Sequence, residues 1–506
     1  MEKIKILFHS DFCLANTGFA KNAKNILSYL YNTNKYEIIS YNCGMVQGDP
    51  NLLRTPWKSY GTMPSNKAEL DNILNQHPPE HREPISRRIA YGEYYLDHII
   101  QTEKPDVYIG VQDIWGVDYS VDKNWFKNIH SVIWTTLDSM PLLQTAVDMA
   151  PKIKNYWMWS NFAEKEMHRL GHKHVKTVHT GIDKNNFHRL EQYKKNELRQ
   201  KFGIDKDTFI IGFVARNQLR KQFINLIEGF SIFKKNNPNV KAKLLFHTNW
   251  AEPGGWDIHK FANIYGVDTK DILTTYICKA CRNYHIKDFT GHDTNCPLCK
   301  HEKSCITTGV QFGVNEHQLN EIYNLMDIYV HPFSSGGIEI PILEAKLAEI
   351  ITCVTNYSCG EELCEDGSGT LPLEFSKYYE HGTNFIKATT SPSSIAKQIQ
   401  KVFNMDDSKR REFSKIGREW AVKNFSTEIV GKTIEQFLDN LPKINYDNFK
   451  KEEVKIQNPQ ADINDILNHP DDEFFIREIY KRILNVTEPD IAGLNHWKGF
   501  LAQGNN

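Results

Sequence analysis

The sequence has no apolar run of roughly 18 or more residues, which is the length a membrane-spanning helix needs. It also has no excess of either charge, since 61 Lys and Arg residues face 62 Asp and Glu residues and the formal net charge is −1. A protein that coats nucleic acid along its whole length carries a strong positive excess. We therefore expect a globular protein that folds in water and has no membrane span.

Signals for export and for a disulfide framework are also missing. The first eight residues alternate charged and apolar side chains as a strand does, and they lack the apolar core and small-residue cleavage site of a signal peptide. Of the ten cysteines, four have metal-ligand spacing and the others are scattered, which fits a reducing compartment. These features predict a cytoplasmic protein.

The length of 506 residues exceeds what one hydrophobic core usually organises. A strand pattern at residues 4–9 is followed by a loop and a helical pattern at 20–31, and a new series of strand and helix patterns begins at 207–215. Such alternation predicts an α/β fold with parallel, doubly wound sheets. The predicted parts are an N-terminal Rossmann-like domain (1–205), a second Rossmann-like domain (206–441), a polar linker (442–468) and a small helical C-terminal module (469–506).

Four cysteines form two C-x-x-C pairs, Cys278 with Cys281 and Cys296 with Cys299, separated by fourteen residues. This spacing is close to that of a tetrahedral site with four thiolate ligands. A redox pair is the alternative, but two such pairs in one polar loop do not suit it. We predict one structural Zn²⁺ per chain in a zinc ribbon of about residues 270–306, inserted outside the strand-and-helix plan of the second domain.

Several short motifs follow one another in a fixed order along the chain. They are Thr17-Gly18-Phe19-Ala20 after the first strand, Leu137-Asp138-Ser139-Met140-Pro141, Val178 to Asp183, Val214 to Lys221, and Pro341-Ile342-Leu343-Glu344-Ala345. Their ordered combination resembles the family-four retaining glycosyltransferases over about residues 1–441, apart from the insertion. The resemblance implies a GT-B fold, in which two Rossmann-like domains face a cleft. It also implies transfer of a sugar from a nucleotide-diphosphate sugar without a catalytic metal. In such a transfer we expect the zinc ribbon to serve the sugar acceptor and not the nucleotide-sugar donor.

The resemblance also implies roles for individual residues. Arg216 and Lys221 match the basic residues of the family's Gly-Arg-x4-Lys element and follow a predicted strand, where ligands bind in open α/β sheets. They would stabilise the departing diphosphate, with Arg220 as the adjacent candidate if the register slips by one. Gly18 belongs to the glycine loop that would approach the donor. Asp138 would face the cleft and orient an acceptor or sugar hydroxyl, without acting as a nucleophile.

The donor motif departs from the family pattern at one end. Glu344 matches the second glutamate of the Glu-x7-Glu motif and would accept hydrogen bonds from the ribose hydroxyls, but Gly336 stands where the family has the first glutamate. Glu339 replaces a glycine of the motif, whereas Gly337 is retained. Either Glu339 supplies the missing carboxylate from a shifted position, or the pocket holds its sugar differently.

Three hypotheses about function remain open. The leading one is a retaining glycosyltransferase whose acceptor, a glycan, protein or nucleic acid, is not identified. A second is a glycosyltransferase that modifies a nucleic acid base or a protein through the ribbon. The ribbon could equally form a contact between subunits of an oligomer. A third is a catalytically inert GT-B binding protein, because of Gly336. The stretches 474–484 and 488–497 resemble a small helical domain of unknown function, to which we assign no chemistry.

Overall fold

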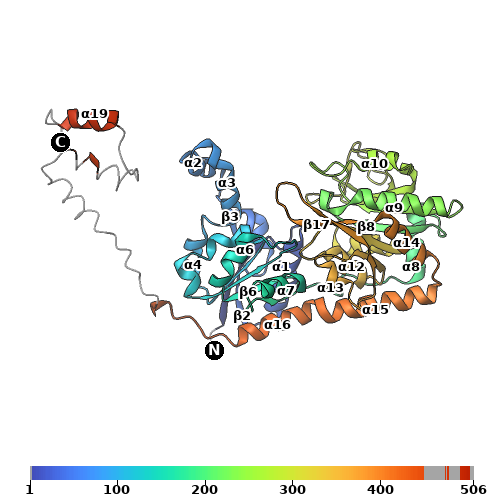
Figure 1. The fold of residues 1–506 in the computed structure, drawn as a ribbon, viewed down its shortest axis with the longest axis horizontal. Helices are drawn as coiled ribbons and strands as arrows, with labels where there is room; N and C mark the ends of the chain where they lie inside the picture. Colours follow the sequence, from blue (N-terminus) through green and yellow to red (C-terminus); the bar gives the residue numbers. More distant parts are fainter. Residues whose placement is uncertain (1–2, 449–472, 474–475, 478–490, 502–506) are drawn as a thin grey trace. The chain divides into compact units, whose positions relative to one another are not determined.

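The computed structural model describes residues 3–448, 473, 476–477 and 491–501 (Figure 1). The chain divides into two compact units, Met1–Ile444 and Asn445–Asn506. In the second unit the helix α19 (Ile491–Leu501) is described, and most of the predicted linker and helical module lies outside the described residues. Among the described helices, none combines the length and the apolar character that crossing a membrane requires.

The first unit begins with a sheet of seven parallel strands in the order β3-β2-β1-β4-β5-β6-β7. Its strands are β1 (Ile4–Asp11), β2 (Tyr36–Val46), β3 (Lys58–Met63), β4 (Val107–Val111), β5 (His130–Thr135), β6 (Asn155–Met158) and β7 (Lys176–Thr177). Its helices are α1 (Gly18–Asn32), α2 (Lys67–Asn75), α3 (Pro79–Ala90), α4 (Leu96–Glu103), α5 (Ile114–Val117), α6 (Gln144–Met149) and α7 (Asn161–Arg169). The predicted parallel α/β architecture is confirmed.

Local sequence explains how α1 starts and which face it buries. Thr17 caps the helix, because its side-chain oxygen accepts a hydrogen bond from the backbone N–H of Ala20 at 3.1 Å. Ile26 and Leu30 follow at helical spacing and are fully buried against the sheet. The cap and the apolar face together fix where the first turn of α1 stands relative to the loop after β1.

A second sheet of eight strands has the path β11-β10-β9-β8-β13-β14-β15, with β12 paired to β10. Its strands are β8 (Phe209–Val214), β9 (Ala242–His247), β10 (Ile272–Cys278), β11 (Tyr284–Asp288), β12 (Cys305–Thr307), β13 (Ile328–His331), β14 (Ile351–Thr355) and β15 (Thr370–Leu373). Its helices are α8 (Gln192–Lys201), α9 (Phe223–Asn236), α10 (Ile258–Ile264), α11 (Glu316–Leu325), α12 (Ile340–Leu347), α13 (Gly360–Leu363) and α14 (Pro392–Phe403). A hairpin of β16 (Phe375–Tyr379) and β17 (Ile386–Thr390) stands beside this sheet.

The cysteine-rich segment begins within the second sheet, because its first strand, β10, extends that sheet and ends on the first of the four clustered cysteines. Strand β10 pairs in parallel with β9, and all seven of its residues are buried. Strands β11 and β12 then pair with β10 in antiparallel fashion. The reason is that the segment from Ile272 to Ile277, rich in β-branched and aromatic residues, is buried along its length as a strand of the main sheet and ends directly on Cys278.

The last helices connect the two sheets. Helix α15 (Asp407–Phe425) and helix α16 (Thr427–Asp439) follow one another, and Ser426 separates them. Helix α16 returns to the first half: Glu435 accepts a hydrogen bond from the Tyr29 hydroxyl at 2.7 Å, and the rings of Phe437 and Trp157 lie 5.0 Å apart. Figure 1 shows α15 along the half with the second sheet and α16 along the half with the first.

Candidate functional site

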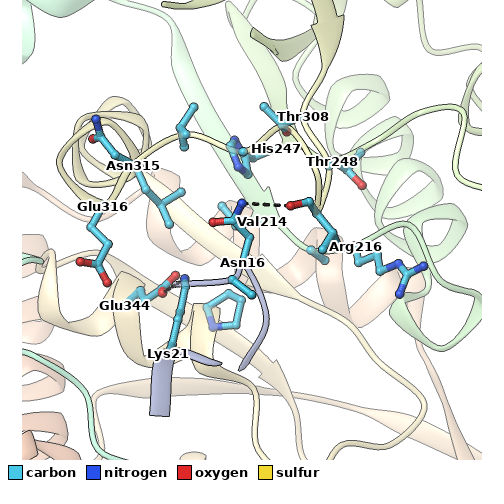
Figure 2. A pocket seen from close by; sticks show the side chains of 18 of the residues that line it. Asn16, Lys21, Val214, Arg216, His247, Thr248, Thr308, Asn315, Glu316 and Glu344 are labelled. Carbon is cyan, nitrogen blue, oxygen red and sulfur yellow. Dashed lines mark hydrogen bonds and ion pairs between the residues drawn. The ribbon is translucent and has the colours of Figure 1, made fainter. Parts of the chain in front are cut away.

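Both halves of the first unit line one pocket, which encloses about 360 Å³ (Figure 2). The first half contributes the loop after β1 and the first turns of α1, including Asn16, Lys21 and Lys24. The second half contributes residues at the ends of β8 and β9, together with α11 and α12. Ligands of open α/β folds bind at the carboxyl ends of the strands, so this pocket lies where the fold predicts a site.

Glu344 is the buried carboxylate of the pocket, with 1% of its side chain exposed. Its Oε2 accepts a hydrogen bond from the Tyr323 hydroxyl at 2.8 Å, and its Oε1 pairs with the ammonium of Lys21. Lys21 belongs to α1 in the opposite half, and Lys24, one turn further along α1, pairs with Glu316 at 2.6 Å. The sequence predicted Glu344 as a donor-binding residue, but it did not predict either lysine. The only sequence feature that marks the two lysines is their three-residue spacing just after the glycine loop.

A second carboxylate, Glu339, precedes α12 and lies among basic groups. It pairs with the Lys221 ammonium, with Arg220 Nη1 at 2.8 Å and with His331 Nε2 at 3.2 Å, and 4% of its side chain is exposed. Burial by itself would raise the pKa of Glu339, but the charges of Lys221 and Arg220 outweigh it and hold that pKa well below its ordinary value. Burial lowers the pKa of Lys221 to about 8 and that of His331 to about 4.

The position of Glu339 bears directly on the missing glutamate at Gly336. A Cβ atom added to Gly336 would lie 2.5 Å from Glu339 Oε1. The Glu339 carboxylate therefore fills the space that a side chain at position 336 would enter. Gly337, in contrast, is held against the first half, because a Cβ there would lie 2.4 Å from Thr136 Cβ. Only glycine permits this approach between the halves.

The two predicted diphosphate residues are not side by side. Arg216 lies at the edge of the pocket, where its Nε donates to Glu252 Oε1 at 2.7 Å and 54% of its side chain is exposed. Figure 2 shows its guanidinium directed away from Lys21 and Glu344. Lys221 is buried with Glu339, and its neighbour there is Arg220, the residue expected if the register slips by one.

Asp138 and Gly18 both lie where the halves meet. Asp138 Oδ2 accepts a hydrogen bond from the Ser335 hydroxyl of the second half at 3.0 Å, and Lys387 Nζ of β17 lies 3.7 Å from Oδ1. Asp138 also lines a hollow of about 210 Å³ together with Asp113 and Trp115. Lys387, which is buried, was not found by sequence reasoning. Gly18 is the first residue of α1, and a Cβ there would lie 3.3 Å from Ile340 of α12.

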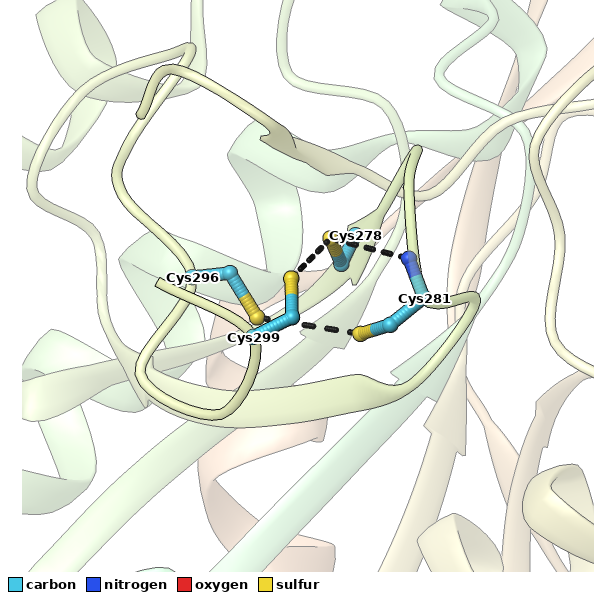
Figure 3. A group of neighbouring side chains, drawn as sticks. All are labelled: Cys278, Cys281, Cys296 and Cys299. Carbon is cyan, nitrogen blue, oxygen red and sulfur yellow. Dashed lines mark hydrogen bonds between the residues drawn. The ribbon is translucent and has the colours of Figure 1, made fainter. Parts of the chain in front are cut away.

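The four predicted metal ligands come together (Figure 3). The sulfur atoms of Cys278, Cys281, Cys296 and Cys299 all lie within 4.8 Å of one another, with 3.6 Å between Cys278 and Cys299 and 3.8 Å between Cys281 and Cys296. These distances are far longer than a disulfide bond of about 2.05 Å. Tetrahedral zinc with Zn–S bonds of about 2.3 Å places its sulfur ligands about 3.8 Å apart, so the cluster fits that ion.

Comparisons with known proteins identify the fold. The chain is 23% identical over 253 residues to the capsular polysaccharide biosynthesis glycosyltransferase CapM of Staphylococcus aureus, a match that covers 50% of this chain and 52% of CapM. The chain thus spans about half the length of that curated relative. No family model matches.

Two solved structures extend the likeness over most of the chain. A glycosyltransferase from Rickettsia africae matches with a TM-score of 0.59 and 14% identity, covering 87% of this chain and 99% of its own. Anabaena HepE in complex with UDP and glucose matches with a TM-score of 0.57 and 13% identity, covering 87% and 100%. With its two sheets of mainly parallel strands, this chain has the GT-B fold of glycosyltransferases.

Proposed function

We propose that this chain is a retaining glycosyltransferase that takes a sugar from a nucleotide-diphosphate donor. The observation that carries the proposal is the pocket between the halves, which combines a buried carboxylate, Glu344, with cationic side chains at the carboxyl ends of the strands. A carboxylate accepts hydrogen bonds from the hydroxyls of a ribose, and cationic side chains donate charge-assisted hydrogen bonds to a diphosphate. The relationship to CapM and the fold support this class of activity.

Each predicted residue has a role in the proposal. Glu344 binds the ribose hydroxyls, Arg216 closes the outer edge of the pocket, and Lys221 with Arg220 provides positive charge for the diphosphate as it leaves. Asp138 orients a sugar or acceptor hydroxyl. The glycines at positions 18 and 337 let the backbone of each half approach the donor.

Glu339 supplies the carboxylate that is missing at position 336. Its carboxylate lies in the space of a side chain at position 336 and holds Arg220 and Lys221 in place, which supports the shifted-carboxylate alternative. This argument favours an active transferase over an inert binding protein. The remaining alternative is an acceptor that is a nucleic acid or a protein. Among the described residues we find no contact that supports it.

The division of the chain into domains is part of the same proposal. We assign residues 1–205 to the acceptor half and 206–441 to the donor half, with α16 returning to the first. The four clustered cysteines hold one structural Zn²⁺, because their sulfur spacing matches a closed tetrahedral site. Transfer itself is proposed to need no divalent cation.

A panel of UDP, GDP and ADP sugars with EDTA tests the donor assignment, beginning with UDP-glucose because HepE was solved with UDP and glucose. Ligand at one hundred times its dissociation constant should stabilise the chain by about 2.7 kcal/mol. NMR of the released sugar should then show the donor's own anomeric configuration. Inverted product would refute the retaining mechanism, and no stabilisation by any panel member would refute the donor assignment.

A further inference from the structure

We propose that Lys21 is a displaceable partner of Glu344 that makes the pocket select nucleoside diphosphates over nucleosides. The proposal rests on the proposed function, in which Glu344 binds the ribose hydroxyls. Lys21 was not predicted from the sequence, and it comes from the half opposite to Glu344. Its role follows from what already occupies the carboxylate.

Both oxygens of Glu344 are taken by side chains of the chain itself. Tyr323 donates to Oε2 at 2.8 Å, and Lys21 pairs with Oε1. A carboxylate can accept about four hydrogen bonds, so its acceptor capacity is not exhausted, but only 1% of the Glu344 side chain is exposed. A ribose can therefore reach this carboxylate only if one of the two partners moves aside.

Lys21 is the partner that can leave. The Tyr323 side chain is fully buried, and its ring packs edge-on against Phe187 and Tyr329 at centroid distances of 5.9 Å and 5.8 Å. Lys21 keeps 26% of its side chain exposed on the pocket wall, and its flexible stem can swing without disturbing α1. The hydroxyls of a ribose would then satisfy the oxygen that Lys21 gives up.

The displaced ammonium determines what kind of ligand binds well. A nucleoside fills the place of Lys21 on Glu344 but offers no anion to the lysine, so breaking the ion pair is uncompensated. A nucleoside diphosphate brings phosphate oxygens into the same pocket, and these accept from the freed ammonium in charge-assisted hydrogen bonds. Lys21 would thus oppose nucleosides and favour diphosphates.

Lys24 provides a matched control on the same face of α1. It also lines the pocket and also forms an ion pair across the halves, but its partner is Glu316 at 2.6 Å. Glu316 also accepts a hydrogen bond from Asn186 Nδ2 at 3.0 Å, so this pair belongs to the interface between the halves and not to the carboxylate that binds the ribose.

The test is calorimetric titration of UDP and uridine into the wild-type chain, Lys21→Gln and Lys24→Gln; if the panel selects another base, its diphosphate and nucleoside replace them. Lys21→Gln should bind UDP roughly tenfold more weakly and uridine no more weakly than wild type, so the preference for the diphosphate falls about tenfold. Lys24→Gln should keep the wild-type preference. Lys21→Ala serves as a second variant if the glutamine is not accommodated, since water from the pocket can then hydrate Glu344.

The outcomes separate this proposal from the proposed function. An unchanged preference in folded Lys21→Gln or Lys21→Ala, or a loss of preference in Lys24→Gln alone, overturns the role of Lys21 and leaves the donor pocket standing. A wild-type chain that binds no nucleoside diphosphate overturns both proposals.

Discussion

Replacing Cys296 and Cys299 with serine is expected to weaken nucleotide binding, although neither cysteine lines the pocket. The reason is that the metal cluster and the pocket wall share strands. Cys305 of β12 stands opposite Cys278 of β10, and the chain continues from β12 through Thr307 directly into the pocket-lining residues Thr308 to Val310. Loss of the metal therefore releases one wall of the pocket.

The magnitude follows from the contacts that hold this wall. The Thr307 hydroxyl accepts from the backbone N–H of Trp250 at 3.3 Å and donates to Asn249 Oδ1 at 3.2 Å, and the backbone N–H of Thr308 donates to the Thr275 carbonyl at 3.3 Å. A net contribution of about 1 kcal/mol for each hydrogen bond gives a loss of roughly 1–3 kcal/mol, or about 5-fold to 150-fold in affinity.

The assay combines metal analysis with titration of a nucleoside diphosphate, namely the one whose sugar the panel selects. Wild-type protein should contain one zinc per chain and the double variant none. A double variant of cysteines outside the cluster, Cys43→Ser with Cys364→Ser, controls for thiol loss. The reasoning is refuted if the variant is folded and free of zinc yet binds nucleotide within about twofold of wild type, a result that would also support the original expectation that the ribbon serves the acceptor.

Three further predictions concern the contacts between the halves and the Glu339 cluster. Glu339→Gln leaves Lys221 and Arg220 without their buried anion, so urea denaturation should show a loss of about 3 kcal/mol in the free energy of unfolding, and an unchanged midpoint would contradict the cluster. The pKa of about 8 for Lys221 means that the free lysine loses its charge as pH rises through 8. A bound diphosphate would stabilise the charged ammonium, so that Lys221 keeps its proton in the complex. Diphosphate affinity should therefore fall roughly tenfold per pH unit above 8, and the fall should be absent in Lys221→Arg. Gly337→Ala should drive a methyl group into Thr136, costing about 1–3 kcal/mol of stability by calorimetry, and Gly337→Ala with Thr136→Gly should recover part of it.

The parallel sheets and the metal ligands could be predicted because their signals are local. Short buried strands such as Val107–Val111 and Ile328–His331 consist mostly of apolar residues that are adjacent in the sequence. The two C-x-x-C pairs each carry their spacing within four residues. Such patterns need no knowledge of which segments meet in space.

The contacts between the halves could not be predicted because they join distant residues. Lys21 and Glu344 are 323 positions apart, and no periodicity relates one to the other. The segment that forms β10 falls inside the predicted insertion of about residues 270–306, and only strand pairing shows that it extends the main sheet. The separation of Arg216 from Lys221 likewise depends on acidic partners, Glu252 and Glu339, that lie elsewhere in the sequence.

Titration of the selected nucleotide sugar into the wild-type chain and Glu344→Gln, both in EDTA, tests the central claim most directly. The account predicts binding by the wild-type chain and roughly 100-fold weaker binding by the variant, since two charge-assisted hydrogen bonds to the ribose are weakened. Equal affinity of the two proteins, with both folded, would place the donor outside this pocket and contradict the account.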